Sequence, residues 1–292
     1  MAGTVLTGAG VLTLLFVAYQ LWGTGIYNAR AQSDLKAAFK SEVAERASPA
    51  PAAATAPSPP VSVPEPPPPP AGEAVAIIRI PKIGLDQAVV QGVSTADLRK
   101  GPGHYPWTPL PGQGGNAAIA GHRTTYGAPF NRLDELSPGD EIHVTTLKGS
   151  STYRVRDLAI VQPSQVDVLD PTPEPRLTLT TCNPKYSAAE RLVVVADLAP
   201  GEAGTPPTPP PSAAGGTQPA PRELAQAGLS ASRHSKLSTG AWGLATVLVG
   251  GTWWSAVRRR RRRSTYVAGA PLFLIVLFGF YANLELLLPS NF

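Results

Sequence analysis

The sequence predicts an all-β central domain combined with three membrane-spanning helices. Short runs rich in β-branched residues fill residues 74–199, proline-rich stretches border this region on both sides, and three long apolar segments lie outside it. The chain has 33 prolines and 28 glycines among 292 residues, which is too many for one compact fold. Part of the chain must therefore serve as linker.

The first apolar segment covers residues 1–27. No charged residue occurs in positions 5–27, and about 20 apolar residues are enough to span a bilayer. The segment is longer than the roughly 7 to 15 residues of a signal-peptide core, although an Ala-Arg-Ala sequence at 29–31 would allow cleavage. We therefore expect an uncleaved N-terminal anchor helix in the lipid bilayer.

Two further apolar segments, 237–257 and 265–288, follow near the C-terminus. The loop between them, residues 258–264, contains six consecutive arginines. Basic residues in short loops stay on the cytoplasmic side of a membrane. This predicts a multi-pass protein of the cell membrane, whose N-terminus and arginine-rich loop are cytoplasmic and whose residues 28–236 are extracytoplasmic.

Two linkers are expected beside the central domain, at residues 28–73 and 200–236. Eleven prolines occur in residues 49–70, and residues 200–221 are rich in Pro, Gly, Ala and Thr. Such segments cannot form a packed core and are typical of extended polyproline spacers. We therefore place one folded domain between them, at residues 74–199.

This central region has the pattern of β-strands separated by turns. Its only plausible helical pieces are short, at residues 95–98 and 128–136. Gly- and Pro-containing turns separate seven apolar or β-branched runs, which cover residues 75–80, 86–92, 116–123, 141–147, 151–161, 176–182 and 192–198. Seven or eight closely spaced strands with little helical periodicity predict a closed or nearly closed barrel.

The net charge of +5 does not indicate a nucleic-acid partner. Six of the 25 basic residues form the single arginine run, and residues 74–199 carry twelve basic and twelve acidic residues. No domain-wide basic surface is therefore available to bind a phosphate backbone. The single cysteine also excludes an intrachain disulfide and a zinc site built on several thiolates.

That cysteine, Cys182, ends a predicted strand and is followed by Asn183-Pro184, so its thiol should face an opening of the barrel. A single cysteine is more often a buried apolar residue, but an odd thiol outside the membrane suggests a reactive one. A cysteine nucleophile needs a nearby base or cation. His122 closes the apolar run 116–120 and is the best candidate for the base; the alternatives are His104, His143 and His234.

Arg191 could supply the cation. It lies nine residues after the cysteine and begins the next predicted strand, so a hairpin-like return would bring its guanidinium beside the thiol. A fixed cation there could stabilise a developing oxyanion. A surface arginine at a strand start is the alternative interpretation.

At these residues the chain resembles the sortases, the Gram-positive cysteine transpeptidases that anchor proteins to the cell wall or join pilins. TLTTCNPKYSAAERLVVVA at 178–196 contains the family's TLxTC and downstream arginine, and GHRTTYGAPFNRLDEL at 121–136 contains its histidine. GPGHYPWTPLPGQGGNAAIAGHRTTYG resembles class E, the actinobacterial type. The resemblance implies an eight-stranded β-barrel with short helices over residues 74–199, and His122, Cys182 and Arg191 as its catalytic residues.

The resemblance also implies the reaction and its partners. The enzyme would cleave secreted proteins between Thr and Gly of a C-terminal Leu-Ala-any-Thr-Gly sorting signal and join the Thr to an amine of a peptidoglycan precursor, without cofactor or metal. Tyr126 matches a tyrosine associated with this signal, and Tyr126 and Thr181 are the candidate substrate-binding residues. Trp107 departs from class E, where a small residue is common. The paired C-terminal segments lie outside the resemblance.

Three other functions remain open on the sequence alone. The same three residues could serve a membrane-tethered cysteine peptidase or a sortase that polymerises pilins. A non-enzymatic alternative is an anchored β-barrel that only binds its partner. Analysis of products with and without an amine acceptor separates transfer from hydrolysis.

Overall fold

The computed structural model describes residues 2–47, 69–200, 233–260 and 263–284. The chain divides into two compact units, one of residues 24–219 and one of residues 1–23 with 220–292. The predicted linkers fall largely on residues 48–68 and 201–232, outside the described residues. The same holds for positions 261–262 of the arginine run and for residues 285–292.

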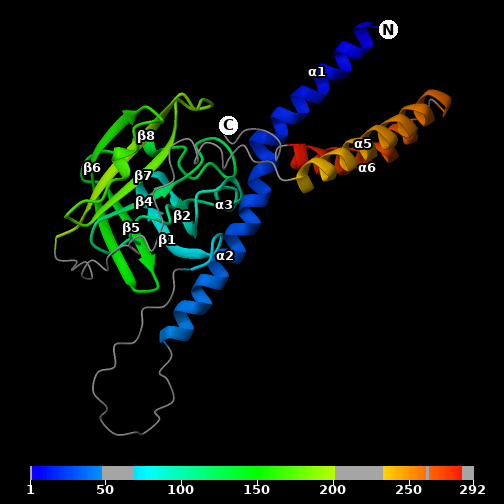
Figure 1. Cartoon of the computed structure of the whole chain (residues 1–292). Helices are drawn as coiled ribbons and strands as arrows, with labels where there is room; N and C mark the ends of the chain where they lie inside the picture. Colours follow the sequence, from blue (N-terminus) through cyan, green and yellow to red (C-terminus); the bar gives the residue numbers. More distant parts are fainter. Residues whose placement is uncertain (1, 48–68, 201–232, 261–262, 285–292) are drawn as a thin grey trace, which may run out of the picture. The chain divides into compact units, whose positions relative to one another are not determined.

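The first unit contains a closed β-barrel of eight strands, with neighbours in the order β1-β2-β3-β4-β7-β8-β6-β5 (Figure 1). Two neighbouring pairs are parallel, β2 with β3 and β4 with β7, and the other pairs are antiparallel. The strands are β1 (Ala74–Ile80), β2 (Leu85–Gln91), β3 (Gly103–His104), β4 (Asn116–Ala120), β5 (Glu141–Thr146), β6 (Gly149–Val161), β7 (Arg176–Asn183) and β8 (Glu190–Leu198).

The predicted barrel and its seven strand runs are therefore confirmed, and the eighth strand is β3. This strand has only two residues, which is too short to give a recognisable alternation of apolar residues. The helical segments of the barrel are α3 (Thr95–Leu98) and three short 3₁₀ turns at Pro81–Ile83, Leu133–Glu135 and Val166–Leu169. The expected helix at 128–136 is thus reduced to one turn.

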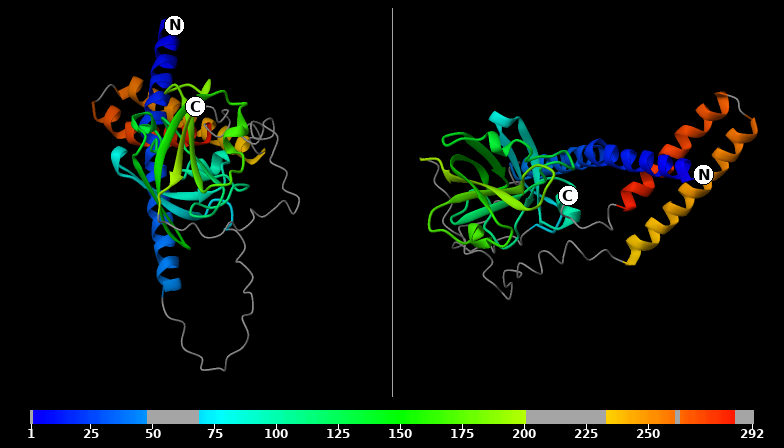
Figure 2. Two further views of the ribbon diagram at one scale, coloured as in Figure 1. Left: turned by 90° about the vertical axis from the view of Figure 1, so that its left-hand side faces the viewer. Right: turned by 90° about the horizontal axis from the view of Figure 1, so that it is seen from above.

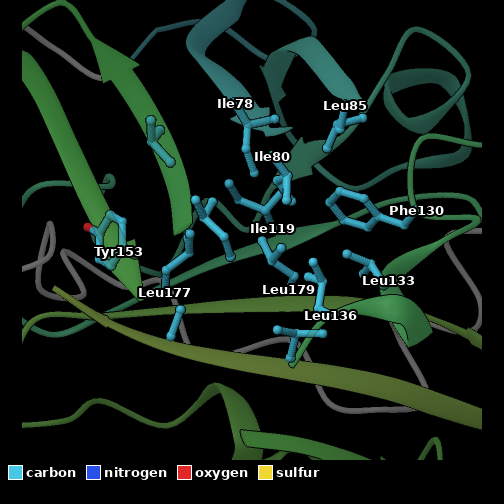
Figure 3. Close-up of a cluster of buried hydrophobic side chains, with 14 of the residues drawn as sticks. Ile78, Ile80, Leu85, Ile119, Phe130, Leu133, Leu136, Tyr153, Leu177 and Leu179 are labelled. Carbon is cyan, nitrogen blue, oxygen red and sulfur yellow. The ribbon is translucent and has the colours of Figure 1, made fainter. Parts of the chain in front are cut away.

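Aliphatic and aromatic side chains from most of the strands fill the barrel. Figure 3 shows Ile78, Ile119, Leu177 and Leu179 in this cluster, and all four are fully buried. Ile119 and Leu179 are register partners on the neighbouring strands β4 and β7. Every residue of β4 is also buried. A strand that is buried on both faces reads as a nearly continuous apolar run, which explains why the sequence NAAIA lacks alternation.

Helix α2 (Thr24–Ala47) packs against β1 and β2 of the same unit. The Gln32 side chain accepts a hydrogen bond from the backbone N–H of Ala88 at 2.7 Å and donates one to its carbonyl at 3.0 Å. Phe39, farther along the helix, is 2% exposed. The expectation of a linker over 28–73 is therefore wrong for residues 28–47, which contain no proline and many helix-forming Ala, Glu, Lys and Arg residues.

The described residues of the second unit are helical. It contains α1 (Ala2–Ala18), a π-helical turn at Tyr19–Gly23, α5 (Arg233–Arg260) and α6 (Arg263–Leu284). Helices α5 and α6 run side by side (Figure 2) and are joined by a hydrogen bond from the Thr239 hydroxyl to the Asn283 carbonyl, 2.9 Å. In the part of the chain that the structure describes, no helix is both long enough and apolar enough to cross a bilayer. The three membrane spans therefore stay predictions.

Candidate active site

Cys182 lies one residue before the end of β7. Pro184 follows the strand and has no N–H to continue the ladder. The thiol forms no disulfide and Cys182 is partly exposed, whereas residues 177–181 of the same strand are buried. The sulfur is therefore available at the end of a barrel strand.

Arg191 is the direct partner of Cys182 across the antiparallel pair of β7 and β8. Side chains of residues directly opposite in such a pair lie on the same face, with Cβ atoms about 4.5–5.5 Å apart. The guanidinium donates hydrogen bonds to the carbonyls of Ala188 at 3.0 Å and Glu190 at 2.9 Å. These bonds restrain the guanidinium of the residue that pairs with Cys182.

His122 is brought to the same level by the parallel pairing of β4 with β7. Ala120 is the register partner of Thr180, and the contact continues beyond β4 because the Gly121 N–H donates to the Thr180 carbonyl at 3.0 Å. His122 comes two residues after Ala120, and Cys182 two residues after its partner Thr180, so the two residues lie at neighbouring ends of these segments. The topology therefore brings together the ends of three segments that carry a thiol, an imidazole and a guanidinium.

The imidazole of His122 is held in its neutral form. Burial, and secondarily the positive charge of Arg99, lower its pKa to about 4. The Nε2 atom is buried and has no hydrogen-bond partner among the described residues. A neutral imidazole with a free nitrogen can accept a proton from a thiol or an amine at neutral pH.

Tyr126, expected to bind substrate, lies behind His122. It is 4% exposed, and its ring centroid is 5.2 Å from that of His122. The Arg99 guanidinium lies 5.1 Å from the ring centroid on a cation–π contact, and the backbone N–H of Tyr126 donates to the Thr24 hydroxyl at 3.1 Å. Tyr126 is therefore a buried contact of His122, and its role in substrate binding stays a prediction.

Thr181, the second expected substrate-binding residue, is 3% exposed. Its hydroxyl donates to the Gly121 carbonyl at 2.8 Å. The bond joins the residue before the cysteine to the residue before the histidine. Thr181 therefore ties the two catalytic segments together, a role that the sequence analysis did not predict.

Tyr105 is a neighbour of the site that the sequence analysis did not single out. Its hydroxyl lies 3.2 Å from the Thr180 hydroxyl, and its ring packs edge-to-face on Trp107, with the centroids 5.2 Å apart. Burial raises the pKa of Tyr105, whereas the Thr180 hydrogen bond and the Arg191 charge oppose this rise. The phenol is thus near enough to the site for the charge of Arg191 to act on it.

Arg123 was also missed, although it follows His122 directly. Its Nη1 donates to the Cys182 carbonyl at 3.1 Å and to the Asn183 side-chain oxygen at 2.7 Å. The sequence signal was available, since an arginine beside a candidate histidine is easy to see. What the sequence does not reveal is that this guanidinium turns inward to the cysteine strand.

The other histidines have different surroundings. His104 belongs to β3 and is 1% exposed. Its ring nitrogens are 2.9 Å from the Gln91 side-chain oxygen and 3.0 Å from the Pro109 carbonyl, and burial lowers its pKa to about 4. His143 lies on β5 with a side chain 39% exposed, as predicted. The side chain of His234 is outside the described residues.

This arrangement is suited to acyl transfer. A thiol at a strand end can attack a carbonyl, a neutral imidazole at the same level can take and return a proton, and a restrained guanidinium can stabilise negative charge. Several polar contacts hold the three segments in register.

Comparisons with known proteins show which family this chain is similar to. Residues 78–199 match the family model described as the sortase domain. Sortase SrtE1 of Streptomyces coelicolor is 32% identical over 210 residues, which cover 66% of this chain and 54% of that protein. Sortase D of Bacillus subtilis is 35% identical over 114 residues, 39% of this chain and 56% of that protein.

A solved structure of a sortase E mutant from Streptomyces avermitilis is also similar, with 37% identity, a TM-score of 0.40 and coverage of 44% of this chain and 89% of that one. The chain spans about half the length of the two curated relatives named above.

Proposed function

Since residues 78–199 place the chain in the sortase family, we propose that this protein is a cysteine transpeptidase that joins secreted proteins to a cell-wall amine. The single observation that carries the proposal is the direct pairing of Cys182 with Arg191 across β7 and β8, at the level of His122. A transpeptidase needs a nucleophile, a proton carrier and a cation at one place.

The first half of the reaction forms a thioester. Neutral His122 accepts the thiol proton, and the Cys182 sulfur attacks the carbonyl carbon of Thr in the sorting signal. Arg191 stabilises the oxygen that becomes negative. When the Thr–Gly bond breaks, His122 returns its proton to the departing amine, and the Gly-side fragment leaves.

The second half transfers the acyl group. An acceptor amine attacks the thioester carbonyl, and His122 takes the proton that the amine loses. The bond to sulfur breaks, the acceptor is joined to Thr by an amide, and the thiolate regains the proton. The sequence resemblance to class E supports a Leu-Ala-any-Thr-Gly signal and a peptidoglycan precursor as the acceptor.

The proposal includes attachment to the cell membrane with the barrel outside. Its support is the uncharged stretch at 5–27 and the six-arginine loop between two apolar segments. Carbonate extraction of membranes should leave the protein in the pellet, and protease added outside spheroplasts should digest residues 74–199. Release by carbonate, or protection of the barrel from the external protease, would overturn this part.

The transfer reaction is tested with the full chain and a fluorescent Leu-Ala-any-Thr-Gly peptide, with and without an oligoglycine amine. Mass analysis should find the Thr-containing fragment joined to the amine, with loss of turnover in Cys182→Ala, His122→Gln and Arg191→Gln. Two controls of matched type, His143→Gln and Arg154→Gln, change exposed strand residues and should retain activity. Cleavage by water alone would indicate a peptidase, and the absence of cleavage would contradict the proposal.

A further inference from the structure

A buried arginine lies between the segment that carries His122 and the strand that carries Cys182. The side chain of Arg123 is 4% exposed. Its Nη1 donates to the backbone carbonyl of Cys182 at 3.1 Å and to the Asn183 side-chain oxygen at 2.7 Å. Nη2 forms an ion pair with Asp134 at 3.1 Å. One guanidinium therefore contacts the nucleophile's own backbone and the region that follows the histidine.

The contacts continue on both sides of Arg123. The Asn131 side chain donates to the Arg123 carbonyl at 2.8 Å, which anchors the backbone of the histidine loop. The Asn183 side chain donates to Glu190 at 2.8 Å, and Glu190 precedes Arg191. A chain of hydrogen bonds thus connects the three segments that carry the thiol, the imidazole and the catalytic cation.

A buried arginine is costly unless its charge is paired and its donors are used. Here Nη1 bonds to the cysteine strand and Nη2 pairs with Asp134, whereas the buried Nε has no hydrogen-bond partner among the described residues. A lysine ammonium cannot reproduce both bonds to the strand and the ion pair at once. Asp134 is 43% exposed, so the ion pair alone is partly screened by water. The contacts to Cys182 and Asn183 are partly buried.

We propose that Arg123 is a positioning residue for acyl transfer: its guanidinium fixes the backbone of Cys182 relative to His122. The proposal rests on the proposed transpeptidase function for its kinetic consequence. Arg123 acts through the Cys182 carbonyl and not on substrate, so its loss should affect the chemical step more than binding. A misplacement of about 1 Å can reduce a rate by about 100-fold.

The first test compares Arg123→Lys with wild type in the full chain. We expect kcat for peptide transfer to fall roughly 10- to 100-fold with little change in KM, because the reacting groups are misaligned. Arg132→Lys is the matched control: Arg132 lies on the same loop, is 50% exposed and pairs with Glu135 at 2.6 Å. The control should keep wild-type kcat.

A second test uses the chain's single cysteine. The rate at which iodoacetamide alkylates Cys182, followed by intact mass at fixed pH, reports the surroundings of the thiol without any substrate. We expect a several-fold change in Arg123→Lys and none in Arg132→Lys. In Arg123→Ala, added guanidinium ion should restore part of the lost kcat, which a general loss of stability would not allow.

The outcomes separate the two proposals. Normal kcat and normal alkylation in Arg123→Lys, with active wild-type enzyme, would overturn the positioning role and leave the transpeptidase intact. An inactive wild type whose alkylation rate still changes on Arg123→Lys would support the positioning role and contradict the proposed reaction. A fall in kcat matched by Arg132→Lys, or with KM rising in proportion, would also overturn the positioning role.

Discussion

Replacing Gln32 by Met tests whether helix α2 is part of the folded barrel unit. The Gln32 amide makes three hydrogen bonds, two to Ala88 at 2.7 and 3.0 Å and one to the Lys100 carbonyl at 2.9 Å. Gln32 is 7% exposed, so water cannot readily replace these bonds. At roughly 0.5–1.5 kcal/mol net for each bond, Gln32→Met should lower the free energy of unfolding by about 2–4 kcal/mol. Methionine preserves side-chain length and helix propensity.

The assay is equilibrium urea unfolding of the full chain in mild detergent, with hydrogen–deuterium exchange of residues 85–91 to localise the effect. Lys36→Met, one turn along the same helix, is the control. Lys36 is 28% exposed and its partner Asp86 is 44% exposed, so the loss should stay below about 1 kcal/mol. A Gln32→Met loss no larger than that of the control, or unchanged exchange in β2, would refute the docking of α2.

Four further results are expected. Burial holds the pKa of His122 at about 4 instead of 6.5 in the folded chain, so the unfolded chain takes up a proton first as pH falls between these values. Wild type should therefore lose roughly 3 kcal/mol of stability over this range, which His122→Gln should not lose. Parallel curves of unfolding free energy against pH for the two proteins, from pH 7 to 4, would contradict this. Thr181→Val removes the bond to Gly121 and should cost about 1–2 kcal/mol in urea unfolding and reduce kcat, whereas an unchanged kcat would exclude its role in holding the site. Leu179→Ala leaves a cavity at a fully buried position and should lower the free energy of unfolding by about 2–5 kcal/mol. A loss of less than about 1 kcal/mol would show that the position of Leu179 is exposed to water. Gly121→Ala would bring a Cβ within 2.6 Å of the Phe130 ring, so it should lower both melting temperature and kcat, and a variant with wild-type values would show that the loop yields easily.

The barrel was predictable because its strands follow local rules. Runs such as 192–198 are β-branched and bounded by turn residues, and recognising them needs no knowledge of distant contacts. Cys182 and Arg191 could be paired from sequence since only a short connection separates their strands. His122 could be proposed from its position after the run 116–120 and from the family motif, but its approach to Cys182 depends on the parallel pairing of β4 and β7, which are distant in sequence.

The packing of α2 on the barrel and the positions of Arg123 and Tyr126 depend on long-range contacts, which the sequence did not reveal. Helix α2 lies next to a proline-rich segment, and nothing in its local pattern shows that Gln32 substitutes for a strand partner at Ala88. The direction of the Arg123 side chain and the burial of Tyr126 likewise depend on contacts made only after the barrel closes. These are tertiary contacts between segments far apart in the chain, which helix and strand propensities do not encode.

The central claim is that Cys182 forms a thioester with the substrate. The most direct test is the mass of the intact protein, acid-quenched during turnover of a Leu-Ala-any-Thr-Gly peptide without acceptor. The account predicts an added mass equal to the acyl fragment ending in Thr, located at Cys182 by peptide mapping and absent from Cys182→Ala. Peptide turnover with no adduct at Cys182, or an adduct at any other residue, would contradict it.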